Sequence, residues 1–449
     1  MVARFRWRRR DDGARADARP FVTVQLPVYN ERTVVARLIR SIGALDYPRE
    51  RLEVQVLDDS TDETREIVDR EVAELVARGI DAHVVRRADR RGFKAGALDH
   101  GLARAKGELV CIFDADFTPA SDFLLALVGH FGDPKVGMVQ ARWGHENRES
   151  STLTRAQSTL LDGHFVIEHK VRHDSGLFFN FNGTAGVWRK RAIVDAGGWQ
   201  HDTLTEDLDL SYRAQLAGWR FVYAPHVVAP AEVPPDIAAF KSQQRRWAKG
   251  SVQVAKKLVG SILTSKQPLR VKLEALAHLT GNTGYPLVVL LALLLPAMVG
   301  MQLGLPEPVH VALFATSTLS VFLFYETGQR ALGRGAAKRA FDVVAAVALG
   351  IGMSLSQTRA VLSGLFGGTG EFVRTPKVGD ARGALRAYRS VRAGIPGLEL
   401  LFAAWFVFGI VRACEHERWL ALPFFTLFFA GFAWVGVLSV TQWMRESRA

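Results

Sequence analysis

The chain has 449 residues, of which 48% are hydrophobic, and a formal net charge of +12 at pH 7. Much of the basic excess lies beside long apolar runs in the C-terminal half, as in cytoplasmic loops of membrane proteins, which argues against nucleic-acid binding. The two cysteines, Cys111 and Cys414, lack metal-type neighbours, so neither a disulfide framework nor a zinc site is implied.

The N-terminal half has the pattern of an α/β domain. A basic segment, residues 1–20, is not followed by an apolar stretch, so we expect no cleavable signal peptide. Strand-like runs then alternate with apolar residues at helical spacing. The expected strands lie near 21–29, 52–59, 82–87, 109–116 and 136–142. This βαβ series predicts a doubly wound, Rossmann-like domain over residues 21–237, with a binding crevice at the carboxyl ends of the strands.

Polar motifs fall at the predicted ends of three strands: Tyr29 to Glu31, Asp58 with Asp59, and Asp114 with Asp116. Two aspartates at alternate positions can hold a divalent cation through oxygen ligands, although aspartate is also common in strand-to-loop turns. The earlier acidic pair can accept hydrogen bonds from a ribose or a base edge. Because all three motifs lie at strand ends, a binding site is favoured over unrelated turns.

Lys94 follows in the segment RRGFKAGALDHGL, at a glycine-containing helix start. Its charge and the backbone N–H groups there suit a diphosphate, and a solvated surface lysine is the alternative. In the segment LTEDLDLSYR, Thr205 is a predicted N-cap, followed by Glu206, Asp207 and Asp209. Acidic residues stabilise a first helical turn, so local helix stability alone can explain them.

Residues 238–275 mix basic and apolar residues at helical spacing and predict amphipathic helices at a membrane interface. They contain the motif QQRRW, with Gln243, Arg246 and Trp247. An arginine beside a tryptophan can anchor an interfacial helix. It can also offer a guanidinium to pyrophosphate oxygens and an indole face on which a sugar ring stacks.

Residues 276–449 form the predicted transmembrane region, because apolar runs of about 20 residues can cross a hydrocarbon core roughly 30 Å thick. We expect spans near 283–303, 309–326, 396–413 and 419–440. The apolar segment 341–367 is predicted to be an interfacial or re-entrant helix. A crossing there would put the basic loops 329–339 and 374–392 on opposite sides, against the positive-inside rule.

Seven motifs in this order resemble the processive family 2 glycosyltransferases, the cellulose synthase-like group, which have a GT-A catalytic fold. They are QLPVYNE, DDSTDET, FKAGAL, DADF, FFNFNGTAGVWR, LTEDLDLSYR and QQRRW. Within this group, the sequence is most similar to the mannan/glucomannan synthase-like branch, in the segments VQLPVYNE, QVLDDSTDET, VQARWGHEN and FNGTAGVWR. The similarity is strong over about residues 21–255 and looser in the membrane region.

The resemblance implies a role for each motif. Asp207 would be the general base, with Glu206 orienting it or binding nearby cations. Tyr29, Glu31 and Asp59 would contact the nucleoside. Asp114 and Asp116 would hold Mg²⁺ or Mn²⁺ against the diphosphate, with Lys94 nearby. Arg246, in a motif that begins at Gln243, would contact the pyrophosphate, and Trp247 the acceptor sugar. Residues 371–380 resemble a gating loop, matched at Phe372, Thr375 and Lys377, whereas Arg374 departs from its valine.

We therefore expect an integral protein of the inner or plasma membrane with a cytoplasmic catalytic domain. It would extend a β-linked polysaccharide, as an inverting transferase, from GDP-mannose or UDP-glucose. The branch resemblance favours a β-1,4-mannan or glucomannan over a glucan. The alternatives are transfer to a lipid acceptor, of the polyprenyl phosphate or ceramide type, and a scaffold with a degenerate domain. Members of the group usually carry a membrane span before the catalytic domain, and residues 1–20 cannot form one, so the chain is naturally short or starts upstream.

Overall fold

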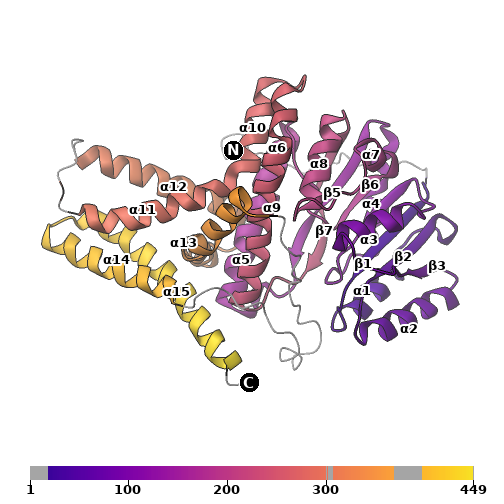
Figure 1. The fold of residues 1–449 in the computed structure, drawn as a ribbon, viewed down its shortest axis with the longest axis horizontal. Helices are drawn as coiled ribbons and strands as arrows, with labels where there is room; N and C mark the ends of the chain where they lie inside the picture. The colour runs from indigo at the N-terminus through magenta and orange to yellow at the C-terminus, as the bar shows by residue number, and fades with distance from the viewer. Residues whose placement is uncertain (1–18, 300, 302–306, 369–396, 448–449) are drawn as a thin grey trace.

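The computed structural model describes residues 19–299, 301, 307–368 and 397–447. The N-terminal half is built on a seven-stranded sheet of order β3-β2-β1-β4-β6-β5-β7 (Figure 1). The strands are β1 (Val22–Val28), β2 (Leu52–Asp58), β3 (Asp81–Val85), β4 (Leu109–Ile112), β5 (Val136–His145), β6 (Gly186–Arg189) and β7 (Arg220–Ala231). All five predicted strands form. The first four are parallel, as expected, but β6 runs antiparallel to β4 and β5.

The sheet is buried on both faces, so that β1 and β2 are buried almost throughout. Their buried polar side chains pair across the two strands, Thr23 with Glu53 and Gln25 with Gln55. One hydrophobic core packs under α1 (Val35–Ile42), α2 (Thr64–Ala77) and α4 (Phe123–Val128). The second core lies on the opposite face, under α3 (Phe93–Leu102), α7 (Lys190–Asp195) and α8 (Glu206–Leu216). This three-layer arrangement leaves the carboxyl ends of the parallel strands free to form a site.

The remaining helices form the second half of the molecule, which extends away from the sheet in Figure 1. A continuous helical segment joins α5 (Thr152–Asp162), the π-helix η5 (Gly163–His169) and α6 (Lys170–Asp174). The later helices are α9 (Ile237–Thr264), α10 (Leu269–Thr280), α11 (Gly284–Met298), α12 (Glu307–Ala331), α13 (Ala336–Phe366), α14 (Leu398–Glu415) and α15 (Leu422–Ser447). Helix α9 and the first half of α10 cover the predicted amphipathic segment 238–275, whose place at a membrane interface stays a prediction. Helix α9 packs along α13.

Three helical segments in the described chain are long and apolar enough to cross a membrane: Leu269–Met298, Ala336–Phe366 and Trp419–Ser447. The first and third contain most of the spans expected near 283–303 and 419–440, and α12 and α14 cover those expected near 309–326 and 396–413. The segment 341–367 lies in α13, which is largely enclosed by its neighbours. Its interfacial placement, like the number of crossings, stays a prediction.

Buried ion pairs join the two halves. The guanidinium of Arg148, after β5, donates to Asp162 at 2.6 Å and to Gln329 of α12 at 2.7 Å. It also lies 3.4 Å from the carboxylate of Asp342 on α13. All four side chains are almost fully buried. Because removing one member would leave an uncompensated charge inside the protein, this network favours one placement of α12 and α13 against the half that contains the sheet.

Candidate active site

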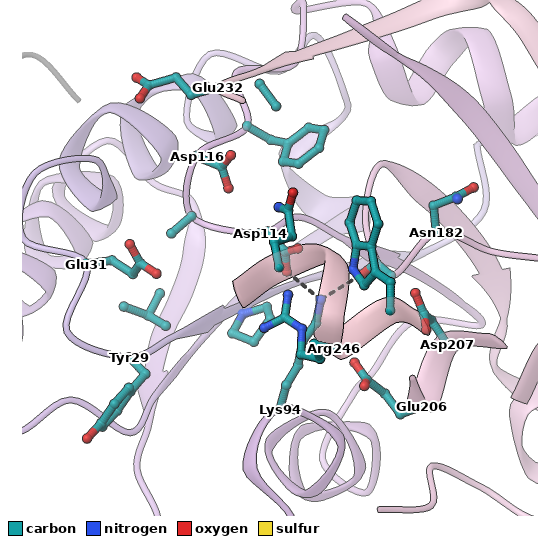
Figure 2. A pocket seen from close by; sticks show the side chains of 18 of the residues that line it. Tyr29, Glu31, Lys94, Asp114, Asp116, Asn182, Glu206, Asp207, Glu232 and Arg246 are labelled. Atoms are coloured by element: carbon teal, nitrogen blue, oxygen red, sulfur yellow. Dashed lines mark hydrogen bonds and ion pairs between the residues drawn. The ribbon is translucent and has the colours of Figure 1, made fainter. Parts of the chain in front are cut away.

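One pocket opens at the carboxyl ends of β1 and β4, between the starts of α3 and α8 and the side of α9. Every predicted site residue that the structure describes lines it: Tyr29, Glu31, Asp59, Lys94, Asp114, Asp116, Glu206, Asp207, Gln243, Arg246 and Trp247. The predicted gating-loop residues Phe372, Thr375 and Lys377 lie outside the described residues, as do residues 1–18 of the basic N-terminal segment. Figure 2 shows Lys94 and Arg246 among the carboxylates of Asp114, Glu206 and Asp207.

The loops after β1 and β2 form one end of the pocket. The predicted acidic pair separates here: Asp58 is buried and accepts from Arg86 Nε at 2.9 Å, whereas Asp59 lines the pocket. The carboxylate of Asp59 is paired with Arg87, whose Nε donates to it at 3.0 Å. An aspartate held in this way has a fixed orientation toward a bound ligand.

Arg90 is a pocket residue that sequence reasoning missed. Its guanidinium carbon lies 3.3 Å from the centre of the Tyr29 ring, a cation–π contact. Arg90 precedes Lys94 by four residues in the motif already singled out, but nothing in the one-dimensional pattern distinguishes it from Arg91. It brings a cation to the end of the pocket that carries Tyr29, Glu31 and Asp59.

Lys94 lies at the centre of the pocket. Helix α3 begins after Gly92, whose φ of +73° favours glycine, and this turn aims Lys94 at the end of β4. Its Nζ donates to Asp114 Oδ1 at 2.5 Å and to the Gly183 carbonyl at 2.9 Å. Burial acts to lower the pKa of Lys94, but the carboxylates of Asp114 and Glu206 outweigh it and raise that pKa. The lysine is therefore a fixed positive charge.

The loop that precedes β6 supplies the wall between Lys94 and Asp207. Gly183 has φ +80°, and a Cβ added there would lie 2.9 Å from Asp207 Oδ2, so only glycine fits. The next residue, Thr184, accepts the backbone N–H of Asp114 at 2.9 Å. The motif FFNFNGTAGVWR thus places the carboxylates at the ends of β4 and α8 around one space.

Helix α8 begins at the predicted place but without the predicted cap. Thr205 occupies the N-cap position, yet its side chain makes no capping hydrogen bond. A Cβ on Gly250 of α9 would lie 2.5 Å from that side chain, so Thr205 packs against α9 instead. Asp209, the third acidic residue after Thr205, is fully buried and paired with Arg213 at 2.8 Å and Lys257 at 3.0 Å, so its role is structural.

Asp207 has the electrostatics of a general base. Its Oδ1 accepts the N–H of Leu208 at 2.8 Å, which orients the carboxylate. Burial and the neighbouring charge of Glu206 raise the pKa of Asp207 to about 7, although Lys94 acts in the opposite direction. A carboxyl group that titrates near neutral pH can accept a proton from a hydroxyl group more effectively than an ordinary aspartate.

Gln243, Arg246 and Trp247 face the pocket from α9, since residues three and four apart lie on one face of a helix. Burial lowers the pKa of Arg246, and Glu206, Asp114 and Asp207 partly offset this. The Trp247 ring centre lies 6.4 Å from that of Trp143, another pocket residue that the sequence did not single out. The two indoles form an aromatic wall suited to a sugar ring.

Within the described residues, no group of three or more histidine, cysteine, aspartate or glutamate side chains forms a complete metal site. Asp114 and Asp116 nevertheless supply carboxylate oxygens to the pocket. Mg²⁺ and similar hard cations commonly bind through one or two carboxylates and complete their coordination with substrate phosphates and water. The donor set therefore fits a divalent ion that binds together with a phosphorylated ligand.

Comparisons with known proteins agree with this geometry. The chain matches the family model described as "Glycosyltransferase like family 2" over residues 19–250. It is 36% identical over 380 residues to glucomannan 4-beta-mannosyltransferase 1 of Cyamopsis tetragonoloba, covering 81% of this chain and 69% of that protein. It is 34% identical to glucomannan 4-beta-mannosyltransferase 2 of Arabidopsis thaliana, covering 93% and 81%.

A solved structure is also similar, that of the mannosyltransferase PcManGT from Pyrobaculum calidifontis in complex with GDP-Man and Mn²⁺. The TM-score is 0.55 at 25% sequence identity, over 78% of this chain and 88% of that one. The likeness extends over most of both chains.

Proposed function

Because this chain belongs to the family 2 glycosyltransferases, we propose that it transfers mannose from GDP-mannose to a growing β-1,4-mannan or glucomannan. It is a hexosyltransferase with a GT-A fold and candidate membrane-spanning helices. The observation that carries the proposal is the gathering of Lys94, Asp114 and Asp207 with the α9 residues Arg246 and Trp247 in one pocket. The GDP-Man and Mn²⁺ in the similar mannosyltransferase structure support this choice of donor and of Mn²⁺ or Mg²⁺.

In the proposed reaction, an acceptor hydroxyl attacks the anomeric carbon of the donor while the bond from that carbon to the diphosphate oxygen breaks. Asp207 Oδ takes the hydroxyl proton. Because the hydroxyl attacks from the face opposite the departing diphosphate, the new bond forms with inversion. Lys94 and Arg246 hold the diphosphate and balance its charge as it leaves. A divalent ion held by Asp114 and Asp116 would supply further positive charge to the diphosphate. Trp247 supports the acceptor sugar.

The candidate membrane helices α13 and α15 pack against α9, which favours a product that leaves toward the bilayer. The basic loops of the C-terminal region favour a cytoplasmic side for the catalytic half. Sugar incorporation by the purified full chain in lipid vesicles with Mn²⁺ tests the function. Labelled GDP-mannose and UDP-glucose are offered separately and together, and the products are digested with β-mannanase or cellulase. We expect high-molecular-weight material that β-mannanase cuts. A short product that is soluble in organic solvent would instead indicate a lipid acceptor.

The pH dependence of kcat/KM for the donor should reveal Asp207. The carboxyl must be ionised to accept a proton, so kcat/KM should fall about tenfold per pH unit below the raised pKa of about 7. Glu206→Gln removes the neighbouring negative charge that helps to raise this pKa, so the midpoint of the acidic limb should move to lower pH. An unchanged midpoint in that variant would assign the limb to another group.

A further inference from the structure

Helix α9 has a glycine in its interior, Gly250, about one turn after the pocket residues Arg246 and Trp247. Residues three and four apart lie on one face of a helix, so Gly250 lies on the face of α9 that carries these two side chains. Its backbone is helical, and alanine would stabilise a helix interior better than glycine does. The reason for a glycine here is therefore to be found in what packs against it.

The side chain that packs against Gly250 is that of Thr205. A Cβ added to Gly250 would lie 2.5 Å from Thr205 Cγ2 and 2.6 Å from Thr205 Oγ1, closer than van der Waals contact allows. Thr205 is buried, and its Oγ1 has no hydrogen-bond partner among the residues that the structure describes, so this side chain acts through its shape. Thr205 directly precedes α8, and Asp207 follows two residues later. The contact therefore joins the helix of the proposed base to the helix of Arg246 and Trp247.

Helix α9 is also enclosed on its other side. A Cβ added to Gly364 of α13 would lie 2.9 Å from Val252 Cβ and 3.0 Å from the Lys249 carbonyl oxygen, so α13 approaches α9 as closely as a glycine permits. The loop before α8 is fastened to α9 as well, because the Leu204 N–H donates to Gln253 Oε1 at 3.0 Å. Since close-packed helices leave no free space, an extra methyl group between α8 and α9 must displace one of them.

We propose that Gly250 and Thr205 are positioning residues for the transfer reaction. Their contact sets the spacing between Asp207 on α8 and the two pocket residues of α9, Arg246 and Trp247. The acceptor hydroxyl must reach the base while its sugar rests on Trp247 and the diphosphate lies against Arg246, so these groups have to be in register. Reacting groups that are misplaced by about 1 Å can slow a reaction about 100-fold. The inference rests on the proposed function, because it concerns how the same site is held together.

A double-mutant cycle on the full chain in lipid vesicles tests this contact. Gly250→Ala should lower kcat about 10- to 100-fold, because the overlap with Thr205 opens the spacing by about 1 Å. Thr205→Ala leaves a gap between the helices and should lower kcat about 3- to 10-fold. In the double variant the contact is between two Cβ atoms, which are 3.0 Å apart before the helices adjust. Its kcat should return to within about 3-fold of the wild type, which is strong coupling of the two sites.

Gly260→Ala is the matched control, since it makes the same change in the same helix. No atom in the part of the chain that the structure describes lies within 4 Å of a Cβ added there. Its kcat should equal that of the wild type, and its melting temperature should not fall, because alanine favours the helix. Each kcat is referred to the folded fraction, measured by circular dichroism. A lower folded fraction alone would leave this kcat unchanged, so its loss and recovery report the positioning.

Two results would overturn the proposal: wild-type kcat in Gly250→Ala, or a double variant that is no faster than Thr205→Ala. The second comparison decides the matter even where Gly250→Ala alone does not fold.

A further measurement does not depend on transfer. Binding of GDP with Mn²⁺, followed by calorimetry, should weaken about 3- to 10-fold in Gly250→Ala, because Arg246 moves away from the diphosphate, and should recover in the double variant. This pattern in a protein that transfers sugar from no donor would count against the proposed function and support the positioning. Transfer by the wild type with equal GDP affinity and equal kcat in all variants would count against the positioning alone.

Discussion

Asp207→Asn is expected to lower kcat for sugar transfer by about 10²- to 10⁴-fold, the usual contribution of a general base. Asparagine has nearly the same shape, and its Oδ1 can still accept the Leu208 N–H that orients the side chain at 2.8 Å. Affinity for GDP-mannose should stay within a few-fold of the wild type, because the base acts on the acceptor proton in the transition state. Transfer rates and donor binding to the same vesicle preparation measure both quantities.

Asp209→Asn is the matched control for this prediction, because it makes the same change two residues further along α8. Asp209 is fully buried between Arg213 and Lys257, outside the pocket. Its substitution should lower the melting temperature, since it removes the buried negative charge that pairs with Arg213 and Lys257, while the folded fraction keeps its kcat. If Asp207→Asn protein kept near-native kcat, Asp207 could not be the base.

The parts of the fold that depend on local pattern were predictable. The strands β1, β2 and β4 are buried by helices on both faces, and their apolar residues and flanking turns identify them in the sequence. The carboxyl ends of parallel strands meet at one edge of a sheet. This rule predicts, from the sequence alone, that Tyr29, Asp59 and Asp114 lie close together. The pocket confirms that these three lie together with Lys94 and Asp207.

Features that depend on tertiary contacts were not predictable. Thr205 has the sequence signature of a cap, but Gly250 of α9 lies against its side chain and the capping bond is lost. The strand β6 is only four residues long, and its antiparallel direction is set by its pairing with β4 and β5 rather than by its own sequence. Asn182 and His164 are 18 residues apart, and no local signal marks a π-helix that brings them together.

Asp114→Asn should weaken metal-dependent donor binding, raising the KM for GDP-mannose and the Mn²⁺ concentration for half-maximal activity, each by about 10- to 100-fold. An amide oxygen carries no charge and is a poorer ligand for a hard cation. The contact of Lys94 Nζ with Asp114 at 2.5 Å shows that this carboxylate already attracts a cation. On donor binding, we expect Lys94 to leave Asp114 and pair with the diphosphate.

A Mn²⁺ titration distinguishes the metal-binding role expected of Asp114 from the role of Asp207 as the base. Excess Mn²⁺ should recover much of the activity of Asp114→Asn and none of that of Asp207→Asn, because only the first defect lies in a binding equilibrium. Asp122→Asn, at the exposed start of α4 and outside the pocket, is the control and should titrate like the wild type. A wild-type Mn²⁺ midpoint in Asp114→Asn would remove Asp114 from the metal site. Asp114 would then act through its contact with Lys94, and Lys94→Met should raise the KM for GDP-mannose as Asp114→Asn does.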